Sequence, residues 1–380
     1  MQFSDIAGQQ AVKQRLIDSV VNNRVSHAQL FLGPEGSGSL ALAVAYAQFI
    51  SCENRNPADS CGECSSCRKY TRLIHPDLHF SYPFFRGGEK EDALPDLPEW
   101  RKLLLENPYF SLDEWRARLD AQNKQPNINK AECLHILRNL ALKPFESEFK
   151  TIIIWLPEFL GNEGNRLLKS LEEPAEKTLI ILVATQSDQI LNTILSRTQL
   201  VKIPALTDAE VSDYLVDRGT DPEKARQLAY LSEGNIQAAL TLLEDETDDH
   251  FTLFSGWLRN CYSDNGTQMI GFTEVAGKLG RENQKGFLRY GINLLRESLL
   301  ILSGAADLVN LPEQEKTFIT NFSRVLSLAK AEGLIAELEK AHFHIERNAN
   351  PKILFLDVSL QFVNILKYNT IPAGTHYIYN

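Results

Sequence analysis

The sequence lacks any uncharged apolar run as long as the roughly 18 residues that a membrane-spanning helix requires. Its first residues, Met1–Ile6, contain neither the basic segment nor the apolar segment of a secretory signal. Internal repeats and low-complexity tracts are also absent from the 380 residues. We therefore expect a cytoplasmic protein that has no membrane partner.

An excess of positive charge is absent as well, because 39 lysines and arginines stand against 49 aspartates and glutamates, a net charge of -10. Binding to nucleic acid through its phosphates depends on clustered basic side chains. This composition excludes a surface that is basic throughout, although it allows local basic patches. An apolar content of 43% with 23% charged residues is ordinary for a globular protein, and the length predicts two or three domains.

A phosphate-binding loop is present in outline, but the residues that would act on a nucleotide are missing from it. The frame G-x-x-x-x-G, with Gly33, Gly36 and Gly38, follows a strand-like run and precedes a helical run, the context that makes such a match credible. A working loop continues with a lysine and a hydroxyl that binds Mg²⁺, where this chain has Ser39 and Leu40. Losing the lysine removes a charge-assisted contact of roughly 1.5 to 3 kcal/mol, and leucine cannot bind a metal. The backbone amides could still attract an anion, but the loop indicates a nucleotide-binding fold that no longer hydrolyses nucleotide.

Four of the six cysteines cluster in the pattern C-x8-C-x2-C-x2-C, which spans residues 52–67. In a reducing compartment such a cluster holds a metal ion more often than it forms disulfides. Four thiolates suit a tetrahedral zinc ion and leave no open position for catalysis. The pattern therefore predicts a structural zinc site made of Cys52, Cys61, Cys64 and Cys67.

Two other interpretations of the cysteine cluster stay open. One is an iron-sulfur cluster, although the ferredoxin spacing needs a further Cys-Pro that the chain lacks. The other is a group of unligated thiols. His75 lies close enough in the sequence to replace a ligand, and its simpler interpretation is a surface or hydrogen-bonded histidine.

Two short isoleucine-rich runs, residues 151–155 and 179–183, predict strands that are covered on both faces of a parallel sheet. An ATPase carries acidic residues at the end of the first of these strands, where they hold Mg²⁺ and orient the attacking water. This chain has Trp155 and Leu156 there, and Glu158 is the only carboxylate nearby. We interpret Trp155 as the filling of an empty pocket.

Several motifs occur together in the order that one protein family has. They are, in chain order, Phe3–Gln9, His27–Phe31, the phosphate-loop frame, the cysteine cluster, Leu167–Pro174 and Ser196–Thr198. With them the chain resembles the clamp-loader branch of the AAA+ family, and within it the delta-prime subunits of bacterial DNA polymerase III. The resemblance covers nearly the whole chain and is strongest before residue 205. It implies an α/β fold with a RecA-like parallel sheet and an inserted zinc module, followed by a small helical lid domain and an all-α C-terminal collar domain.

Strand-like runs end near residue 204, and helical periodicity continues from there. Together with the resemblance, this divides the chain into an AAA+ domain at 1–205, a lid domain at 206–248, a collar domain for oligomerisation at 249–368 and a flexible tail at 369–380. Residues 83–125 interrupt the first domain and look like an insertion relative to the family. A surface hairpin and a partner-binding arm are both open interpretations of this segment.

In the clamp-loader family, a five-subunit ring opens the sliding clamp and places it on primed DNA. Its motor subunits bind ATP, whereas delta-prime subunits are rigid members without nucleotide. Three departures from the motor pattern agree, namely no lysine at position 39, no acidic pair at 155–156, and Gln237 where motors carry arginine. Thr185 matches the first-sensor position but can equally cap a strand.

The resemblance therefore implies a non-catalytic stator that binds no ATP. Its partners would be the motor and delta subunits in a hetero-pentameric ring, with the sliding clamp and primed DNA reached through the complex. The polymerase activity of the holoenzyme would belong to other subunits.

One functional residue of the family is kept. Ser196-Arg197-Thr198 resembles a Ser-Arg-Cys motif whose arginine reaches the phosphates of ATP in the neighbouring subunit. An arginine supplied in trans neutralises charge in the transition state, because its planar guanidinium is always ionised. The resemblance thus implies that Arg197 is catalytic for a site that its own chain does not contain. The alternative is a surface arginine that ends a helix.

Two further functions remain open. The first is an active clamp-loader ATPase that recruits Ser39 and Glu158 as unorthodox nucleotide contacts. The second is a zinc-dependent nucleic-acid-binding module outside replication, against which the acidic composition speaks. Glu172 and Glu173 end a helix and lack a recognisable acid-base setting.

Overall fold

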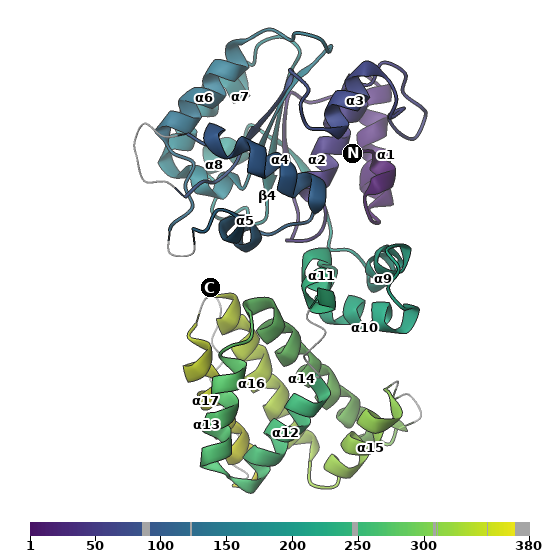
Figure 1. Cartoon of the computed structure of the whole chain (residues 1–380), viewed down its shortest axis with the longest axis vertical. Helices are drawn as coiled ribbons and strands as arrows, with labels where there is room; N and C mark the ends of the chain where they lie inside the picture. The colour runs from purple at the N-terminus through teal and green to yellow at the C-terminus, as the bar shows by residue number, and fades with distance from the viewer. Residues whose placement is uncertain are drawn as a thin grey trace. The chain divides into compact units, whose positions relative to one another are not determined.

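The chain divides into two compact units, residues 1–239 and 240–380, which Figure 1 draws in purple to teal and in green to yellow. The computed structural model describes residues 1–85, 92–121, 124–244, 250–306, 309, 311–347 and 349–368. The predicted tail at 369–380 lies outside the described residues, as do 86–91 and 122–123 of the predicted insertion. Each unit has its own hydrophobic core, which in the first unit consists of two clusters.

The first unit is built on five parallel strands in the order β2-β3-β4-β1-β5. The strands are β1 (Ala28–Leu32), β2 (Leu78–Ser81), β3 (Lys150–Trp155), β4 (Thr178–Ala184) and β5 (Gln199–Lys202). β3 and β4 coincide with the two isoleucine-rich runs, and every residue of both is buried. The predicted parallel sheet is confirmed, and it is consistent with the AAA+ fold that the resemblance implies.

Helices cover both faces of the sheet, so successive side chains of a strand point into two different cores. Ile153 and Ile181 lie in the core of the first face, and Ile152 and Ile180 lie in the core of the second. The first face carries η1 (Phe3–Asp5), α1 (Gln10–Val21), α2 (Ser39–Ser51), α3 (Ser65–Thr71), η2 (Leu94–Asp96), α4 (Leu97–Glu106) and α5 (Leu112–Arg118). The second face carries α6 (Lys130–Ala141), η3 (Pro157–Leu167), α7 (Leu168–Glu172) and α8 (Asn192–Leu195).

The described part of the predicted insertion, within residues 83–125, folds into the core of the first face. Trp100 of α4 and Trp115 of α5 are fully buried. The indole Nε1 of Trp115 donates a hydrogen bond to the carbonyl oxygen of Pro83 at 2.8 Å. In its described residues this segment is therefore a pair of packed helices and not a surface hairpin (Figure 1).

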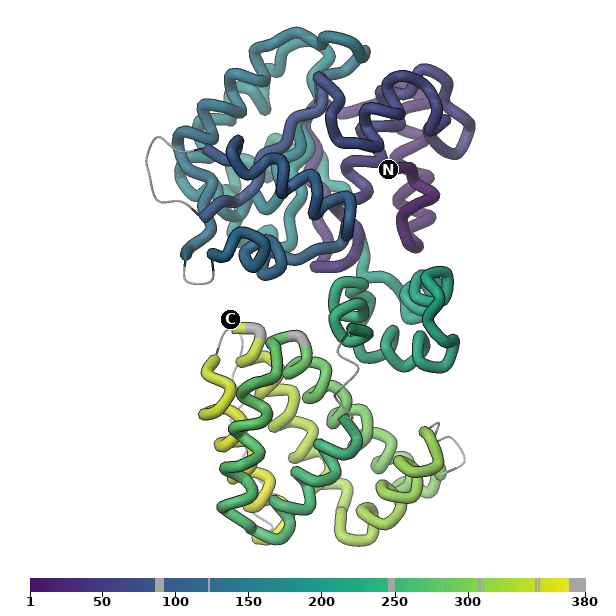
Figure 2. Tube along the Cα trace, in the orientation of Figure 1, coloured from purple at the N-terminus to yellow at the C-terminus, as the bar shows by residue number. Residues whose placement is uncertain are grey.

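After β5 the chain forms three short helices, α9 (Asp208–Asp217), α10 (Pro222–Ser232) and α11 (Ile236–Glu244), which Figure 2 shows in teal to green. α9 begins with a capping box, in which Thr207 and Glu210 exchange hydrogen bonds between side chain and backbone. Up to residue 239 these helices belong to the same compact unit as the sheet. Gln9 joins these helices to the sheet. Its backbone amide donates to the Glu210 carboxylate at 3.1 Å, and its side-chain Nε2 donates to the Pro204 carbonyl at 2.7 Å.

The described residues of the second unit form helices and no strand. They are α12 (His250–Ser263), α13 (Gly266–Ala276), α14 (Arg281–Leu302), α15 (Glu313–Phe322), α16 (Leu328–Glu346) and α17 (Pro351–Leu366). Trp257 is central to the core, since its ring stacks on Phe272 at 4.6 Å and its Nε1 donates to the Ser359 hydroxyl at 2.8 Å. Across the described part of the whole chain, no helix is both long and apolar enough to cross a membrane.

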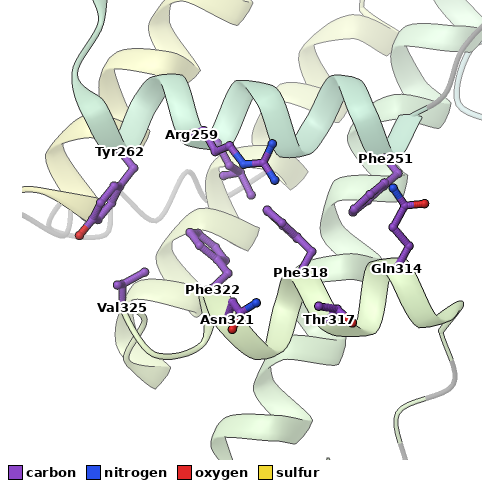
Figure 3. A pocket seen from close by; sticks show the side chains of 10 residues that line it. Phe251, Arg259, Tyr262, Gln314, Thr317, Phe318, Asn321, Phe322 and Val325 are labelled. Carbon is purple, nitrogen blue, oxygen red and sulfur yellow. The ribbon is translucent and has the colours of Figure 1, made fainter.

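A pocket of about 430 Å³ lies between α12 and α15 of the second unit. Figure 3 shows the rings of Phe251, Phe318 and Phe322 on its walls. The Arg259 guanidinium lies 5.5 Å from the centroid of the Phe318 ring. None of the side chains on its walls is among the predicted site residues.

Candidate functional site

The phosphate-binding loop joins the end of β1 to the start of α2. Its backbone turns at Gly36 and Gly38, whose φ angles of 71° and 86° lie in the left-handed region that favours glycine. Gly38 is the N-cap of α2, so the loop presents backbone amides at a helix N-terminus, as a phosphate-binding loop does. The structure thus brings Gly33, Gly36 and Gly38 into one turn before α2.

Buried uncharged side chains occupy the two positions that would carry the nucleotide contacts. Ser39 is 8% exposed, and its Oγ lies 3.0 Å from the Oγ of Ser37. The Ser37 hydroxyl donates in turn to the Pro34 carbonyl at 2.6 Å. Leu40 is 5% exposed and lies in the core of the first face. The two serine hydroxyls therefore bond within the loop, and Leu40 serves packing.

Gln237, which stands where motor subunits carry arginine, lies beside this loop. The Ile236 amide donates to the Gly36 carbonyl at 3.2 Å, and a Cβ at Gly36 would overlap the Asn235 side chain. The Gln237 Oε1 accepts a hydrogen bond from the Asn107 Nδ2. The loop, the start of α11 and the insertion therefore meet at one place, which the sequence did not predict.

The end of β3, where an ATPase carries its acidic pair, is apolar. Trp155 is 6% exposed. Its ring contacts the rings of Trp100 and Phe110, with centroids 5.1 and 5.0 Å apart. Leu156 is buried as well. This packing supports the interpretation of Trp155 as a side chain that fills space at this edge of the sheet.

Glu158 is engaged by the end of β4. Its Oε1 accepts hydrogen bonds from the amides of Thr185 and Gln186 at 2.6 and 2.9 Å, and from the Thr185 hydroxyl at 3.1 Å. Burial raises the pKa of Glu158, while these hydrogen bonds act in the opposite direction. Glu158 and Thr185 thus tie the ends of β3 and β4 together. Their pairing was not predicted, although both residues follow a predicted strand.

The four clustered cysteines surround one point. The Sγ atoms of Cys52, Cys61, Cys64 and Cys67 all lie within 4.8 Å of one another. The Cys52–Cys61 and Cys61–Cys67 Sγ distances are 3.5 and 3.9 Å. A tetrahedral zinc ion with Zn–S bonds of about 2.3 Å separates its sulfurs by about 3.8 Å, whereas a disulfide bond is about 2.05 Å long. The donor set therefore fits a four-thiolate metal site and is compatible with structural zinc.

Backbone amides orient the sulfurs for a metal ion. The amides of Cys61, Cys64 and Cys67 donate to the Sγ atoms of Cys52, Cys61 and Cys64 at 3.2, 3.3 and 3.4 Å. Amide hydrogen bonds lower the pKa of Cys61 to about 6, whereas burial raises the pKa values of Cys52 and Cys67. The first effect favours the thiolate, which is the form that binds metal. A cation among the sulfurs would offset the burial of the other thiolates.

His75 is not part of this group. Its ring packs on Tyr70 with 4.7 Å between the centroids, and its Nδ1 accepts a hydrogen bond from the Asp77 amide at 3.1 Å. Burial lowers the pKa of His75 and so favours the neutral ring. The structure therefore agrees with the interpretation of His75 as a hydrogen-bonded histidine.

The cysteine loop also holds the N-terminal segment. The Asp59 carboxylate accepts hydrogen bonds from the amides of Phe3 and Ser4 at 3.1 and 2.9 Å, and the Gln2 Nε2 donates to the Ser60 carbonyl at 2.5 Å. Phe3 lies in the core of the first face. A metal ion among the cysteines would therefore stabilise the N-terminal segment together with the end of α2.

Arg197 lies between α8 and β5, on the second face of the sheet and apart from the loop and the cysteines. Its side chain is 32% exposed and its Nε donates to the Glu172 carboxylate. Its Nη1 donates to the Thr193 carbonyl at 2.9 Å. The end of α7 thus holds the guanidinium. This partner was not predicted, because Glu172 was assigned only to the end of a helix.

A family profile described as DNA polymerase III, delta subunit, matches residues 8–207, which is more than half of the chain. The DNA polymerase III subunit delta' of Bacillus subtilis is 28% identical over 239 residues, which cover 63% of this chain and 60% of that protein. The DNA polymerase III subunit gamma of Buchnera aphidicola is 26% identical over 251 residues, which cover 64% of this chain and 58% of that protein. The matches thus span about 60% of the length of these relatives.

Two solved structures give looser matches. A Bacillus subtilis DNA clamp loader delta protein is 13% identical with a TM-score of 0.31, over 93% of this chain and 99% of that chain. A gamma subunit-related protein from Thermotoga maritima is 15% identical with a TM-score of 0.37, over 94% of this chain and 100% of that chain.

Cys64→Ser is expected to release the zinc, about one ion per chain, and to destabilise the first unit, because metal-binding energy in a closed thiolate site is also folding energy. Elemental analysis of the purified protein and thermal unfolding measure the two effects. Cys133→Ala is the matched control, since Cys133 is a buried cysteine outside the cluster and its loss should leave the zinc content unchanged. Iron in place of zinc, a wild-type protein without metal, or full zinc content in the Cys64 variant would contradict the prediction.

Proposed function

The chain belongs to the DNA polymerase III delta subunit family, and we propose that it acts there as a delta-prime clamp-loader subunit that binds no ATP of its own. In this role it is a rigid stator in the ring that loads the sliding clamp on primed DNA during replication. The observation that carries the proposal is the condition of the phosphate-binding loop. The glycine frame is folded, but its two working positions are the buried Ser39 and Leu40.

Three separate nucleotide contacts are replaced by contacts within the protein. Ser39 bonds within the loop, Trp155 packs on aromatic rings, and Gln237 accepts a hydrogen bond from Asn107. Each motor residue in these places would add charge-assisted bonds of about 1.5 to 3 kcal/mol or a metal ligand. Their joint replacement supports a subunit without ATPase activity, and the polymerase reaction then belongs to other subunits of the holoenzyme.

Arg197 is the residue through which the chain acts on a neighbouring subunit. A guanidinium is ionised at every physiological pH and suits the phosphates of a nucleotide. Its ion pair with Glu172 is exposed, and exposed pairs contribute only about 0 to 1 kcal/mol. Release from Glu172 therefore costs little, and release from the Thr193 carbonyl costs one further hydrogen bond of about 0.5 to 1.5 kcal/mol. The freed side chain reaches the ATP of an adjacent motor subunit, where an arginine in trans accelerates hydrolysis by about 10³ to 10⁵.

The remaining parts of the chain serve the assembly. Residues 206–248 act as the lid domain and residues 249–368 as the collar through which the subunit joins the motor and delta subunits of a hetero-pentameric ring. The sliding clamp and primed DNA are reached through that ring. The four cysteines hold a structural zinc ion, and the protein works in the cytoplasm. The helices of the second unit and the closeness of the four thiols support these assignments.

An active ATPase is the weaker candidate. It would need Glu158 to hold a metal ion or a water molecule. The Glu158 Oε1 is instead bonded to Thr185 and Gln186 at the end of β4, and its burial raises its pKa. The hydrogen bonds occupy Oε1, and the raised pKa favours the neutral carboxyl over the charged form that binds a metal ion.

Arg197→Ala is expected to leave this protein folded and able to assemble, and to lower DNA-stimulated ATP turnover of the reconstituted loader. Hydrolysis at the neighbouring site should fall about 10³-fold or more, while the other sites continue. Steady-state turnover and single-site hydrolysis measure the loss. Lys177→Ala is the control, because Lys177 is also an exposed cation in a surface ion pair. Turnover equal to that of the wild-type ring would remove the proposed role of Arg197.

Ser39→Lys alone is not expected to produce ATPase activity. The lysine would restore one phosphate contact, but the metal ligands would still be missing at Trp155 and Leu156, and Gln237 would still replace the arginine. Phosphate release by the isolated variant is the measurement, with the wild-type chain as the baseline. ATPase activity gained by this single substitution would contradict the assignment of the missing nucleotide contacts to positions 39, 155–156 and 237 together.

A further inference from the structure

The turn between α4 and α5, residues 107–110, lies inside the first unit. Pro108 follows α4 and cannot continue it. The Asn107 Oδ1 accepts a hydrogen bond from the Tyr109 amide at 3.1 Å, which fixes the turn. Tyr109 and Phe110 are only 3% and 5% exposed. The two rings of the turn are therefore packed into the protein, while Asn107 and Pro108 are only partly buried.

Tyr109 fills a space at the start of α2. A Cβ on Gly38, the N-cap of α2, would lie 3.1 Å from the Tyr109 ring. The ring packs edge-on against Tyr214 of α9, with 5.3 Å between the centroids. Its hydroxyl oxygen accepts a hydrogen bond from the Ala7 amide at 2.8 Å. Apolar walls with one backbone N–H are also what a binding pocket offers to a planar heterocyclic base.

Phe110 covers the end of β3 from the same turn. Its ring lies 5.0 Å from the Trp155 ring and 5.2 Å from the Trp100 ring, measured between centroids. In an ATPase, the metal ion is bound at this position beside the end of the strand. One turn therefore covers both the start of α2 and the end of β3.

Asn107 extends the same turn to α11. Its Nδ2 donates to the Gln237 Oε1, while Tyr109 contacts Tyr214 of α9. Two of the three helices that follow the sheet thus touch the turn. These contacts lie within residues 1–239, which form one compact unit.

We propose that residues 107–110 are a built-in occupant of the pocket over the phosphate-binding loop, with Tyr109 standing where a nucleobase would bind. The turn holds α9 and α11 against the sheet without any ligand. The proposal rests on the proposed function in one respect, namely that the loop derives from a nucleotide-binding site. The insertion thus fills a pocket of its own chain. The filled pocket excludes nucleotide independently of the missing lysine at position 39.

Hydrogen–deuterium exchange of the full, zinc-replete chain tests the proposal through Tyr109→Ala. Exchange should rise about tenfold or more at residues 3–9, 33–39 and 208–217, because these segments lose the ring that packs on them. It should stay unchanged in α6 on the other face of the sheet. Leu105→Ala is the matched control, since Leu105 belongs to α4 but is 50% exposed, and it should change none of these segments.

Tyr109→Phe distinguishes the effect of the ring from the effect of its hydroxyl hydrogen bond. This variant also tests the proposal if Tyr109→Ala does not fold. The ring remains in this variant, so faster exchange should be confined to residues 3–9, where the Ala7 amide loses its acceptor. Protection at residues 33–39 should match the wild type. Equal loss of protection in all three segments would overturn the role assigned to the ring.

Free adenine is the probe for the vacated space, because a base without phosphates needs neither a lysine nor a metal ion. At millimolar concentration it should restore protection in Tyr109→Ala, as apolar ligands fill engineered cavities, and should leave the wild type and Leu105→Ala unchanged. Unchanged exchange in Tyr109→Ala, a rise spread evenly over the unit, or a rise that adenine does not reduce would overturn the proposal. None of these readouts involves Arg197 or ATP turnover, so a failure here is distinct from a failure of the stator function.

Discussion

Aromatic closure of the carboxyl edge of the sheet is the constraint on which the first unit depends. Ligands of open α/β sheets bind outside the carboxyl ends of the strands. In this protein β3 ends at Trp155, which packs against Trp100 and Phe110. Rings of this size bury about 150 to 250 Å² each, and truncating a buried one costs about 3 to 5 kcal/mol. Packing of these rings thus stabilises this edge of the sheet.

Close contacts around the phosphate-binding loop explain why the fold needs its glycines. A Cβ at Gly33 would lie 2.7 Å from the Ile203 carbonyl oxygen, and one at Gly36 would overlap Asn235. Gly38 has a left-handed φ and faces Tyr109. The glycines are therefore required by the close approach of neighbouring backbone and side chains. The loop thus joins the sheet to the insertion and to the helices after β5.

Features that depend on neighbouring residues in the sequence could be predicted, and features that depend on distant partners could not. The isoleucine-rich runs predicted β3 and β4, because strands covered on both faces need apolar side chains throughout. The cysteine spacing likewise predicted a group of four thiols that the fold brings together. The pairing of Glu158 with Thr185 and of Arg197 with Glu172 depends on how separate strands and helices end side by side. The burial of the insertion had one local signal, since Trp100, Leu103 and Leu104 follow helical spacing, but its partner Trp155 lies far along the chain.

Calorimetry of ATP binding to the purified, zinc-replete chain, with Mg²⁺ present, measures whether the phosphate-binding loop accepts a nucleotide. Protein concentrations must be high enough to reveal weak sites. A pocket that is filled by Tyr109 and lacks a lysine at position 39 predicts no measurable binding. Micromolar binding of one ATP per chain would mean that the loop still accepts nucleotide, and it would contradict both the closed edge of the sheet and the stator function.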